Sequence, residues 1–372
     1  MPLLVTGSST QLGREIARQL APEHPVIGLD VVPGPRTTHT GRLTDGALIE
    51  RLAGEVDAII HTADLAAPDL DAEHLAATRL LLEAASARRH RRFVYTSATS
   101  VYGAALEAAG VRVTEALAPA PRDARESTRL EAEALCRAAV ERGLATAVLR
   151  TAPLHPDEAE RVAAARLHDG IDPRDAAAAH LAALAGAPAG AVLNVAARSP
   201  FGADDLAELR RDPASAVARH LPEAPAALAS LGWRLPAIGH VIAIDGAVEQ
   251  LGWRPRHGLD SLLRLPGRWL YHLIERAAEQ VRGDLYAPDS LADQGFVHCS
   301  YGPDVRETAR LHFPASADLV VLQIDPRRLG LAVEDEPTPR GPMPHLFGPV
   351  RAAAVTRTRE LGEMDAAPDR LA

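Results

Sequence analysis

The sequence predicts an α/β fold, a doubly wound parallel sheet over residues 1–266, followed by a small α+β domain. Short apolar strands alternate with amphipathic helices through residues 2–195, which is typical of parallel strands joined by helical crossovers. Near residue 266 this alternation stops and turns rich in Gly and Pro begin. We therefore predict a second domain at 268–360 and a flexible tail at 361–372.

The elements follow in a regular order along the chain. Apolar runs predict strands at residues 2–6, 26–29, 58–61, 93–96, 146–149 and 191–195. Helical periodicity predicts helices at 11–20, 45–53, 72–87 and 124–142. In the second domain, strands are predicted at 269–272 and 319–324.

Composition limits the class of protein. The chain has 372 residues and a formal net charge of −9, which disfavours a general nucleic-acid binder. No apolar run reaches the roughly 20 residues that a membrane-spanning helix needs. Cys136 and Cys299 are the only cysteines, so a disulfide framework and a cysteine zinc site are excluded. We expect a cytoplasmic protein that binds neither nucleic acid nor membrane.

A turn with the sequence GSSTQLG joins the first strand to the first helix. The N-terminus of that helix, at Gln11 and Leu12, offers N–H groups and a partial positive charge to a pyrophosphate. Gly7 permits the tight turn, and Gly13 lets the helix pack against the sheet. Thr10 stands between them, where its side chain either adds a hydroxyl donor or crowds a cofactor. The turn predicts a dinucleotide site.

Asp30 ends the second strand, in VIGLDVV. A carboxylate at this position accepts a hydrogen bond from the 2′-hydroxyl of an adenosine ribose and repels a 2′-phosphate. It therefore favours NAD over NADP as the cofactor. The alternative is a solvated residue at the end of a strand.

These segments resemble the extended short-chain dehydrogenase/reductase family, the NAD-dependent epimerase/dehydratase family. The resemblance is carried by TGxxxxxG, LTD, IIHTAD, FVYTSATSVYG and GAVEQLGWRPRHGLDSLLR. It implies a Rossmann-type domain that binds NAD, with Asp45 at the adenine and Ala63 beside the cofactor. It also implies an unidentified small-molecule substrate, a shortened substrate region, and a homodimer formed through the helix at 124–142.

The same resemblance places unusual residues at the catalytic positions. Ala98 stands where the family has Ser or Thr, and Arg125 and Arg129 stand where it has the tyrosine and the lysine. Arginine stays protonated and cannot act as a general base. The resemblance therefore implies an NAD-binding protein whose redox site is impaired, so that it is uncertain whether this domain is an enzyme.

Two alternatives stay open for the first domain. It is either an active epimerase, dehydratase or reductase, in which Ser97, Thr99 or Tyr102 carries the proton, or a non-enzymatic NAD sensor or scaffold.

The second domain resembles the DUF952 family through GDLYAPDSLADQGFVHCS, VEDEP and MPHLFGPV. That family is similar in fold to ADP-ribosyltransferases. The resemblance implies that His272 and His298 line a groove for NAD or ADP-ribose, and that Glu336, with Glu334 as a rival, stabilises an oxocarbenium-like transition state. The domain would bind or transfer an NAD-derived group. The alternative for each residue is a structural role. The histidine spacings match no local metal motif, so we expect no metal site.

Overall fold

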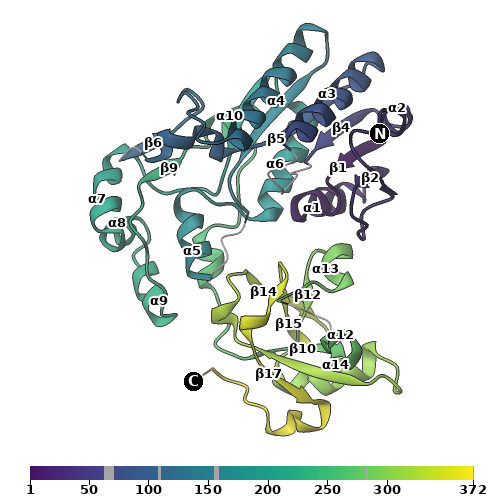
Figure 1. Ribbon diagram of the computed structural model, residues 1–372. Coiled ribbons are helices and arrows are strands. Elements are labelled where there is room, and N and C mark those ends of the chain that lie inside the picture. The colour runs from purple at the N-terminus through teal and green to yellow at the C-terminus, as the bar shows by residue number, and fades with distance from the viewer. Residues whose placement is uncertain (63–70, 108–109, 155–158, 281–283, 372) are drawn as a thin grey trace. The chain divides into compact units, whose positions relative to one another are not determined.

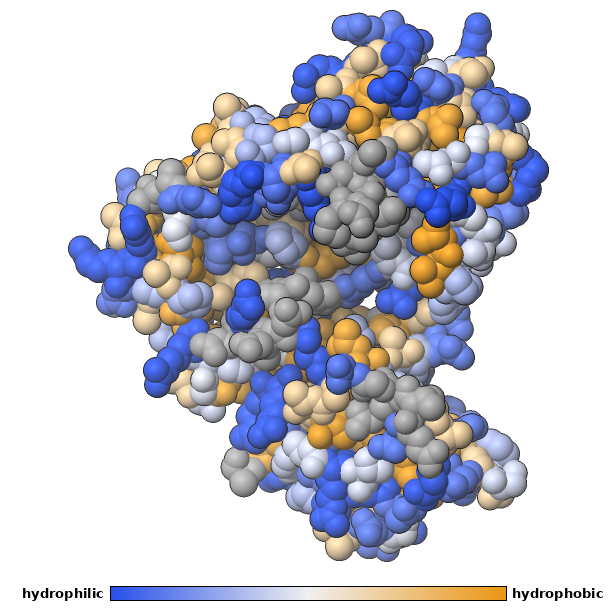
Figure 2. All heavy atoms as spheres, viewed as in Figure 1, coloured by the Kyte–Doolittle hydropathy of each residue, from blue (hydrophilic) through white to orange (hydrophobic). Residues whose placement is uncertain are grey.

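The computed structural model describes residues 1–62, 71–107, 110–154, 159–280 and 284–371. The chain folds as two compact units. The first covers most of the chain up to Gly258, and the second consists of Leu259–Ala372 with two earlier segments, Asp157–Ala163 and Ala226–Arg234. No helix of the described residues is both long and apolar enough to cross a membrane. On the face seen in Figure 2, hydrophobic residues lie scattered among hydrophilic ones.

The first unit is built on a parallel sheet of seven strands (Figure 1). Its order is β3-β2-β1-β4-β5-β7-β8. The strands are β1 Leu3–Thr6, β2 Val26–Asp30, β3 His39–Thr40, β4 Ala58–His61, β5 Arg92–Ala98, β7 Thr146–Thr151 and β8 Ala191–Val195. Six of them are the predicted strands, and β3 was not predicted. The doubly wound α/β fold is therefore confirmed.

Helices cover both faces of this sheet. They are α1 Gln11–Leu20, α2 Gly46–Ala53, α3 Asp71–Ala87, α4 Ala124–Glu141, α6 Pro173–Gly186 and α10 Asp245–Leu251. Alternate strand residues point to opposite faces, so Leu3 and Val5 pack with α1, α6 and α10, whereas Leu4 packs with α2, α3 and α4. Because both faces are buried, the strands read as continuous apolar runs rather than as alternating ones.

A smaller pairing was not predicted. Strand β6 (Val111–Val113) lies parallel to β9 (His240–Ile242) in a separate two-stranded sheet. The first unit also holds α7 (Leu206–Arg211), α8 (Pro213–His220) and, from Ala164 onward, the end of α5 (Ala159–His168).

The order of the seven-stranded sheet reverses between β1 and β4. The chain first adds β2 and β3 on one side of β1, and then returns to add β4 on the other side. In open parallel sheets, ligands bind beyond the carboxyl ends of the strands at this reversal. The fold therefore directs attention to the turn that follows β1.

A buried ion pair joins α4 to β7. The Glu133 carboxylate accepts hydrogen bonds from Nε and Nη2 of Arg150 at 3.0 and 2.7 Å. It also accepts one from the hydroxyl of Ser97, on β5, at 2.6 Å. The side chains of Arg150 and Glu133 are only 6% and 1% exposed. This carboxylate thus holds two strands of the sheet to one covering helix.

The second unit combines short helices with small antiparallel sheets, as the sequence predicts for an α+β region. One sheet has the order β10-β13-β17, a second has the order β12-β15-β14, and β11 pairs with β16. The elements are α9 Ala224–Ser230, which runs into this unit, α11 Leu259–Leu263, β10 Leu270–Glu275, α12 Arg276–Gln280, β11 Leu285–Tyr286, α13 Asp289–Asp293, β12 Val297–His298, α14 Val305–His312, β13 Leu319–Ile324, β14 Val333–Thr338, β15 Gly341–Leu346, β16 Val350–Arg351 and β17 Val355–Glu360.

The end of the chain differs from the expected flexible tail. Residues Leu361–Ala366 form a 3₁₀ helix in which Met364 is buried. Asp369 accepts hydrogen bonds from the Arg268 guanidinium at 2.7 and 3.0 Å. The polar composition of the segment suggested fraying, but one buried methionine and one ion pair attach it to the rest of the unit.

We expect Glu133→Ala to destabilise the first unit by about 3–5 kcal/mol, because it leaves a buried guanidinium without its partner. Glu55→Ala is the matched control, since its pair with Arg51 is about half exposed on both sides and such pairs contribute roughly 0.5 kcal/mol. Urea unfolding followed by circular dichroism measures both variants. Equal stability losses in the two variants would show that the buried pair is not a main support of the fold.

Candidate functional site

The turn between β1 and α1 is the first candidate site. Gly7 has a φ of 72°, a left-handed conformation that glycine adopts without strain. A Cβ on Gly13 would lie 2.1 Å from the Gly7 carbonyl oxygen, so no larger residue fits without a shift of the backbone. The two glycines together let the first turn of α1 lie directly against the end of β1, which is the packing expected from the sequence.

Thr10 uses its hydroxyl inside this turn. The Oγ1 atom donates to the Gly7 carbonyl at 2.7 Å and accepts from the Gly13 backbone N–H at 3.0 Å, as the N-cap of α1. The single hydroxyl proton is therefore committed to the backbone. In this conformation Thr10 fixes the shape of the turn, and its hydroxyl has no proton left for a phosphate.

The N-terminus of α1 presents two backbone donors. Among the described residues, the N–H groups of Gln11 and Leu12 have no hydrogen-bond acceptor. The first turn of α1 also contains no acidic residue that would compete with an anion. The helix dipole places a partial positive charge at the same position. The turn can therefore bind an anionic group of the size of a phosphate.

Asp30 lies beside the turn at the end of β2. Its side chain accepts hydrogen bonds from the backbone N–H of Ser9 at 2.9 Å and of Val32 at 3.1 Å. The residue is only 8% exposed. Each carboxylate oxygen keeps a second lone pair, so Asp30 can still accept a hydrogen bond from a ligand hydroxyl.

The other two predicted cofactor residues have different outcomes. Asp45 is the N-cap of α2, where its carboxylate accepts from the Leu48 N–H at 3.1 Å. Its contact with an adenine stays a prediction. Ala63 lies outside the residues that the structure describes.

The positions at which the family resemblance predicts catalytic residues hold neither a tyrosine nor a lysine. Ala98 ends β5, and Arg125 and Arg129 lie half-buried on α4. His74, on α3, is buried and forms a hydrogen bond of 2.9 Å between its Nε2 atom and the hydroxyl of Tyr95. None of these side chains is a phenol that an adjacent cation could activate.

Tyr102 is the tyrosine that the alternative mechanism uses. It is fully buried, and its hydroxyl donates to Oδ1 of Asn194 at 2.8 Å. The Arg150 guanidinium lies over its ring, 4.9 Å from the centroid. Burial is the main cause of a raised pKa for the Tyr102 hydroxyl. This phenol therefore holds its proton more firmly than a free tyrosine does.

The second candidate site is a pocket of about 1170 Å³ in the second unit. Its walls come from β10, β12, β15, α13, α14 and the segments that follow them. The polar lining includes His272, Tyr286, His298, Ser300, Thr308, Arg340 and His345. The pocket thus brings together both predicted histidines, and adds Tyr286 and Arg340, which the sequence analysis did not single out.

His272 lies in the wall of this pocket as a neutral imidazole. Its Nδ1 atom is 2.7 Å from the His298 carbonyl oxygen, to which it donates, and its Nε2 atom is 3.3 Å from the Tyr286 hydroxyl. Burial is the main cause of lowering the pKa of His272 to about 4. At neutral pH its Nε2 atom is an acceptor, and Tyr286 is the donor that faces it.

His298 and His345 meet edge to face, with ring centroids 5.0 Å apart. His345 stacks on Phe296 at 3.9 Å, and its buried Nδ1 atom has no hydrogen-bond partner among the described residues. His298 is the more exposed of the two, and its Nε2 atom lies 2.9 Å from Oε1 of Gln294. Burial is the main cause of a lowered pKa in both histidines.

Glu336 lies apart from these groups. It is exposed on β14 and is not among the residues that line the pocket. It is paired with Met343, and Glu334 with His345, across an antiparallel ladder. Both glutamates therefore project to the same side of the sheet as the pocket wall. A catalytic role for Glu336 stays a prediction, and the residue lies outside the lining of the pocket.

The guanidinium group of Arg340 lies in the pocket wall without a carboxylate partner among the described residues. Nη1 of Arg340 donates to the hydroxyl of Thr308 at 3.2 Å. Within the described parts of the chain, no carboxylate pairs with this guanidinium. A half-buried arginine that lines a pocket and lacks a counter-ion can bind a phosphate or a carboxylate.

Two protein-family models match separate segments of the chain. Residues 3–155 match the model of the NAD dependent epimerase/dehydratase family. Residues 273–358 match a protein family of unknown function, DUF952. None of the curated proteins matches the chain.

Solved structures of similar fold cover the first unit. A short-chain dehydrogenase/reductase superfamily protein from Agrobacterium tumefaciens with bound NAD is 22% identical, with a TM-score of 0.54 over 70% of this chain and 94% of that one. UDP-glucose 4-epimerase from Bifidobacterium longum, in complex with NAD⁺ and UDP, is 18% identical, with a TM-score of 0.52 over 70% and 95%. The same enzyme from Thermotoga maritima, with UDP-glucose, is 18% identical, with a TM-score of 0.54 over 71% and 97%.

These structures share the Rossmann-type fold of the first unit. The two family models match one segment in the first unit and one segment in the second unit. The chain therefore combines an N-terminal segment that matches the NAD dependent epimerase/dehydratase family model with a C-terminal segment that matches the DUF952 model.

Proposed function

We propose that the first unit binds NAD at the turn between β1 and α1, without running the redox chemistry of its family, and that the second unit binds or acts on an NAD-derived group. The observation that carries the first part is the pair of N–H groups of Gln11 and Leu12, which have no acceptor among the described residues. They lie at the positive end of α1, where the pyrophosphate of a dinucleotide would be bound.

Asp30 sets the choice of cofactor. Its second lone pairs can accept from the hydroxyls of the adenosine ribose, and its negative charge repels the additional phosphate of NADP. Val31 and Val32 follow it and are 45% and 56% exposed. They offer an apolar surface beside the site, which an adenine ring would cover. Relatives with this fold also bind NAD.

The loss of redox chemistry rests on the groups that would have to move a proton. Ser97 donates its proton to the buried Glu133, and Tyr102 donates its proton to Asn194. Both hydroxyls are therefore committed to the structure, which counts against Ser97 and Tyr102 as proton carriers of an active enzyme with atypical residues. Thr99, the third candidate, is also buried, with 3% of its surface exposed. Arg129 cannot replace a lysine that is able to lose its proton.

The second unit offers chemistry of a different kind. Its pocket combines an arginine without a counter-ion, Arg340, with the neutral imidazole of His272 and the exposed imidazole of His298. Such a set suits a ligand that carries both phosphate and ribose hydroxyls, which is the composition of ADP-ribose. If the pocket is catalytic, the N-glycosidic bond between nicotinamide and the ribose C1′ of NAD breaks and nicotinamide leaves. Water then forms the new bond to C1′ and loses a proton to solvent, which gives ADP-ribose.

We expect the full chain to bind NAD, and Asp30→Ala to weaken this binding at least tenfold, because it removes an acceptor for the ribose. The ratio of the NADP to the NAD dissociation constant should fall in the same variant, since the repelling charge is lost. Isothermal titration calorimetry measures both constants. Asp212→Ala removes another helix-capping carboxylate and should leave them unchanged. Equal NAD affinity in the two variants would reject the assigned site.

We expect free nicotinamide to appear when the protein is incubated with NAD, if the second unit is catalytic. The products are separated by chromatography. His298→Ala should abolish the release, because His298 is the exposed imidazole of the pocket. Glu336→Gln tests whether the carboxylate at the edge takes part. NAD that is recovered intact but retained by the protein would instead indicate a binding or sensing role.

The stability of the protein should fall as the pH is lowered from about 6.5 to 4. His272 has a folded-state pKa of about 4, below the unfolded value of about 6.5, so the unfolded chain binds the extra proton in this window. Each pH unit costs about 1.4 kcal/mol for one such group. Because His180 has a similarly low pKa of about 4, His272→Asn should remove part of this dependence. Urea unfolding at pH 7 and pH 5 tests this, and an unchanged difference would refute it.

A further inference from the structure

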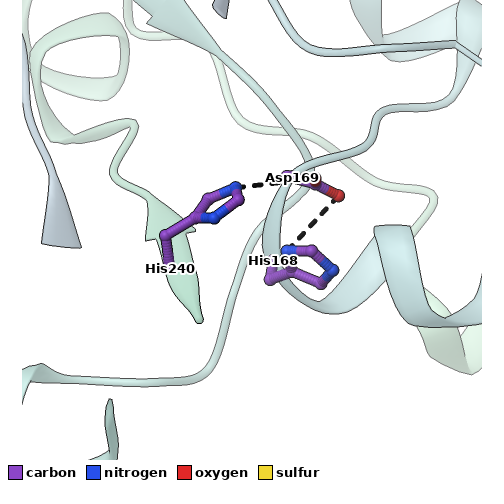
Figure 3. Close-up of side chains that lie close together, drawn as sticks. All are labelled: His168, Asp169 and His240. Carbon is purple, nitrogen blue, oxygen red and sulfur yellow. Dashed lines mark ion pairs between the residues drawn. The ribbon is translucent and has the colours of Figure 1, made fainter. Parts of the chain in front are cut away.

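Three potential metal ligands of the first unit converge at one place (Figure 3). His168 is the last residue of α5, Asp169 follows it, and His240 is the first residue of β9. Each imidazole turns one ring nitrogen toward the Asp169 carboxylate, as the dashed lines in Figure 3 mark. One ligand atom from each of the three residues lies within 4.8 Å of the others. The sequence analysis missed this group because 71 residues separate the two most distant members.

The contacts in this group are longer than good ionic hydrogen bonds. His168 Nδ1 is 3.3 Å from Asp169 Oδ1, and His240 Nε2 is 3.5 Å from Asp169 Oδ2. Hydrogen bonds between charged groups are about 2.7–2.9 Å long. The His168 Nδ1 atom is buried and has no hydrogen-bond partner among the described residues. Buried polar atoms in proteins almost always form a hydrogen bond or bind an ion, so a buried imidazole nitrogen without a hydrogen bond requires an explanation.

The same distances fit a shared cation. Zinc binds His nitrogen and carboxylate oxygen at about 2.0–2.2 Å, so neighbouring ligand atoms in a tetrahedron lie about 3.3–3.5 Å apart. The separations of 3.3 and 3.5 Å, which run to Oδ1 and Oδ2 of the Asp169 carboxylate respectively, are of this size. One ligand atom from each residue lies within 4.8 Å of the others, so a small shift of the side chains brings all three to one ion. The ring centroids of His168 and His240 are 5.4 Å apart, with planes at 80°. The two rings therefore approach the carboxylate without stacking on each other.

The backbone holds the negatively charged Asp169 side chain at the C-terminal end of α5, where the helix dipole is also negative. Its N–H donates to the Ala165 carbonyl at 3.0 Å, which places the carboxylate at the C-terminal end of α5. This end of a helix carries a partial negative charge. The arginine in the last turn, Arg166, is paired with Asp172 at 3.2 Å. A cation bound between the two histidines would offset the repulsion between Asp169 and the helix end.

We propose that His168, Asp169 and His240 bind a divalent transition-metal ion of the zinc class. Two imidazoles and one carboxylate supply three protein ligands and leave at least one coordination position open to water or to a ligand. The side chains are 14%, 31% and 17% exposed, so an ion can reach the site from solvent. Magnesium and calcium, which take oxygen ligands, are not expected to bind there. The proposal is independent of the NAD site.

The test uses the full chain after treatment with a chelator and its removal by dialysis. Zn²⁺ affinity is measured by competition with a chromophoric chelator, and Co²⁺ is added as a spectroscopic probe. We expect one equivalent of Zn²⁺ to bind, and Co²⁺ to give the visible absorption of a four-coordinate site. Asp169→Asn and His240→Gln, which keep the approximate shapes of the side chains, should each weaken Zn²⁺ binding at least tenfold.

His220→Ala is the matched control. His220 is 3.0 Å from a carboxylate oxygen of Asp205, but these two residues form no three-ligand group within the described chain. The control should keep the Zn²⁺ affinity of the unchanged protein. Zn²⁺ should also raise the Tm of the unchanged protein and of the control, whereas Mg²⁺ should not, and this readout does not require the ligand variants to fold. No Zn²⁺ binding by the unchanged protein, or equal affinity in all variants, would overturn the proposal.

Discussion

The contact between Gly13 and the Gly7 carbonyl is the constraint on which the first unit depends. With no Cβ at position 13, α1 begins directly against the end of β1. This brings the positive end of the helix to the carboxyl edge of the sheet, at the point where the strand order reverses. Thr10 then closes the turn with its own hydroxyl, which binds both glycines. The result is a rigid site whose free donors are backbone groups.

Polar side chains near the positions that the family resemblance predicts to be catalytic form hydrogen bonds inside the protein. Glu133 binds Ser97 and Arg150, and Tyr102 binds Asn194. A buried network of this kind is stable only when its members satisfy one another. A group that is already satisfied inside the protein is poorly suited to exchange a proton with a substrate. The first unit therefore combines an intact turn for an anion with a neighbourhood that is organised for stability.

The sequence predicted the parts of the fold that depend on local pattern. The apolar runs of β1, β4 and β7 are recognisable because residues on both faces of a covered sheet are buried. The parallel pairing of β6 with β9 was not predicted, because its partners are more than a hundred residues apart and each strand has three residues. In the same way, His272 and His298 were found from a motif, whereas the group of His168 and His240 depends on the tertiary fold. The exposed position of Glu336 was also not evident, since a strand at a sheet edge has the same local sequence as one beside a pocket.

The residues that line the pocket of the second unit all lie between Tyr271 and His345. The glycine turn and Asp30 lie within the first thirty residues of the chain. Each site is thus encoded by one short, continuous stretch of the gene. A recombination event, or a protein engineer, can exchange the lining of the C-terminal pocket without altering a codon of the N-terminal turn. The two specificities are therefore able to diverge at different rates during evolution.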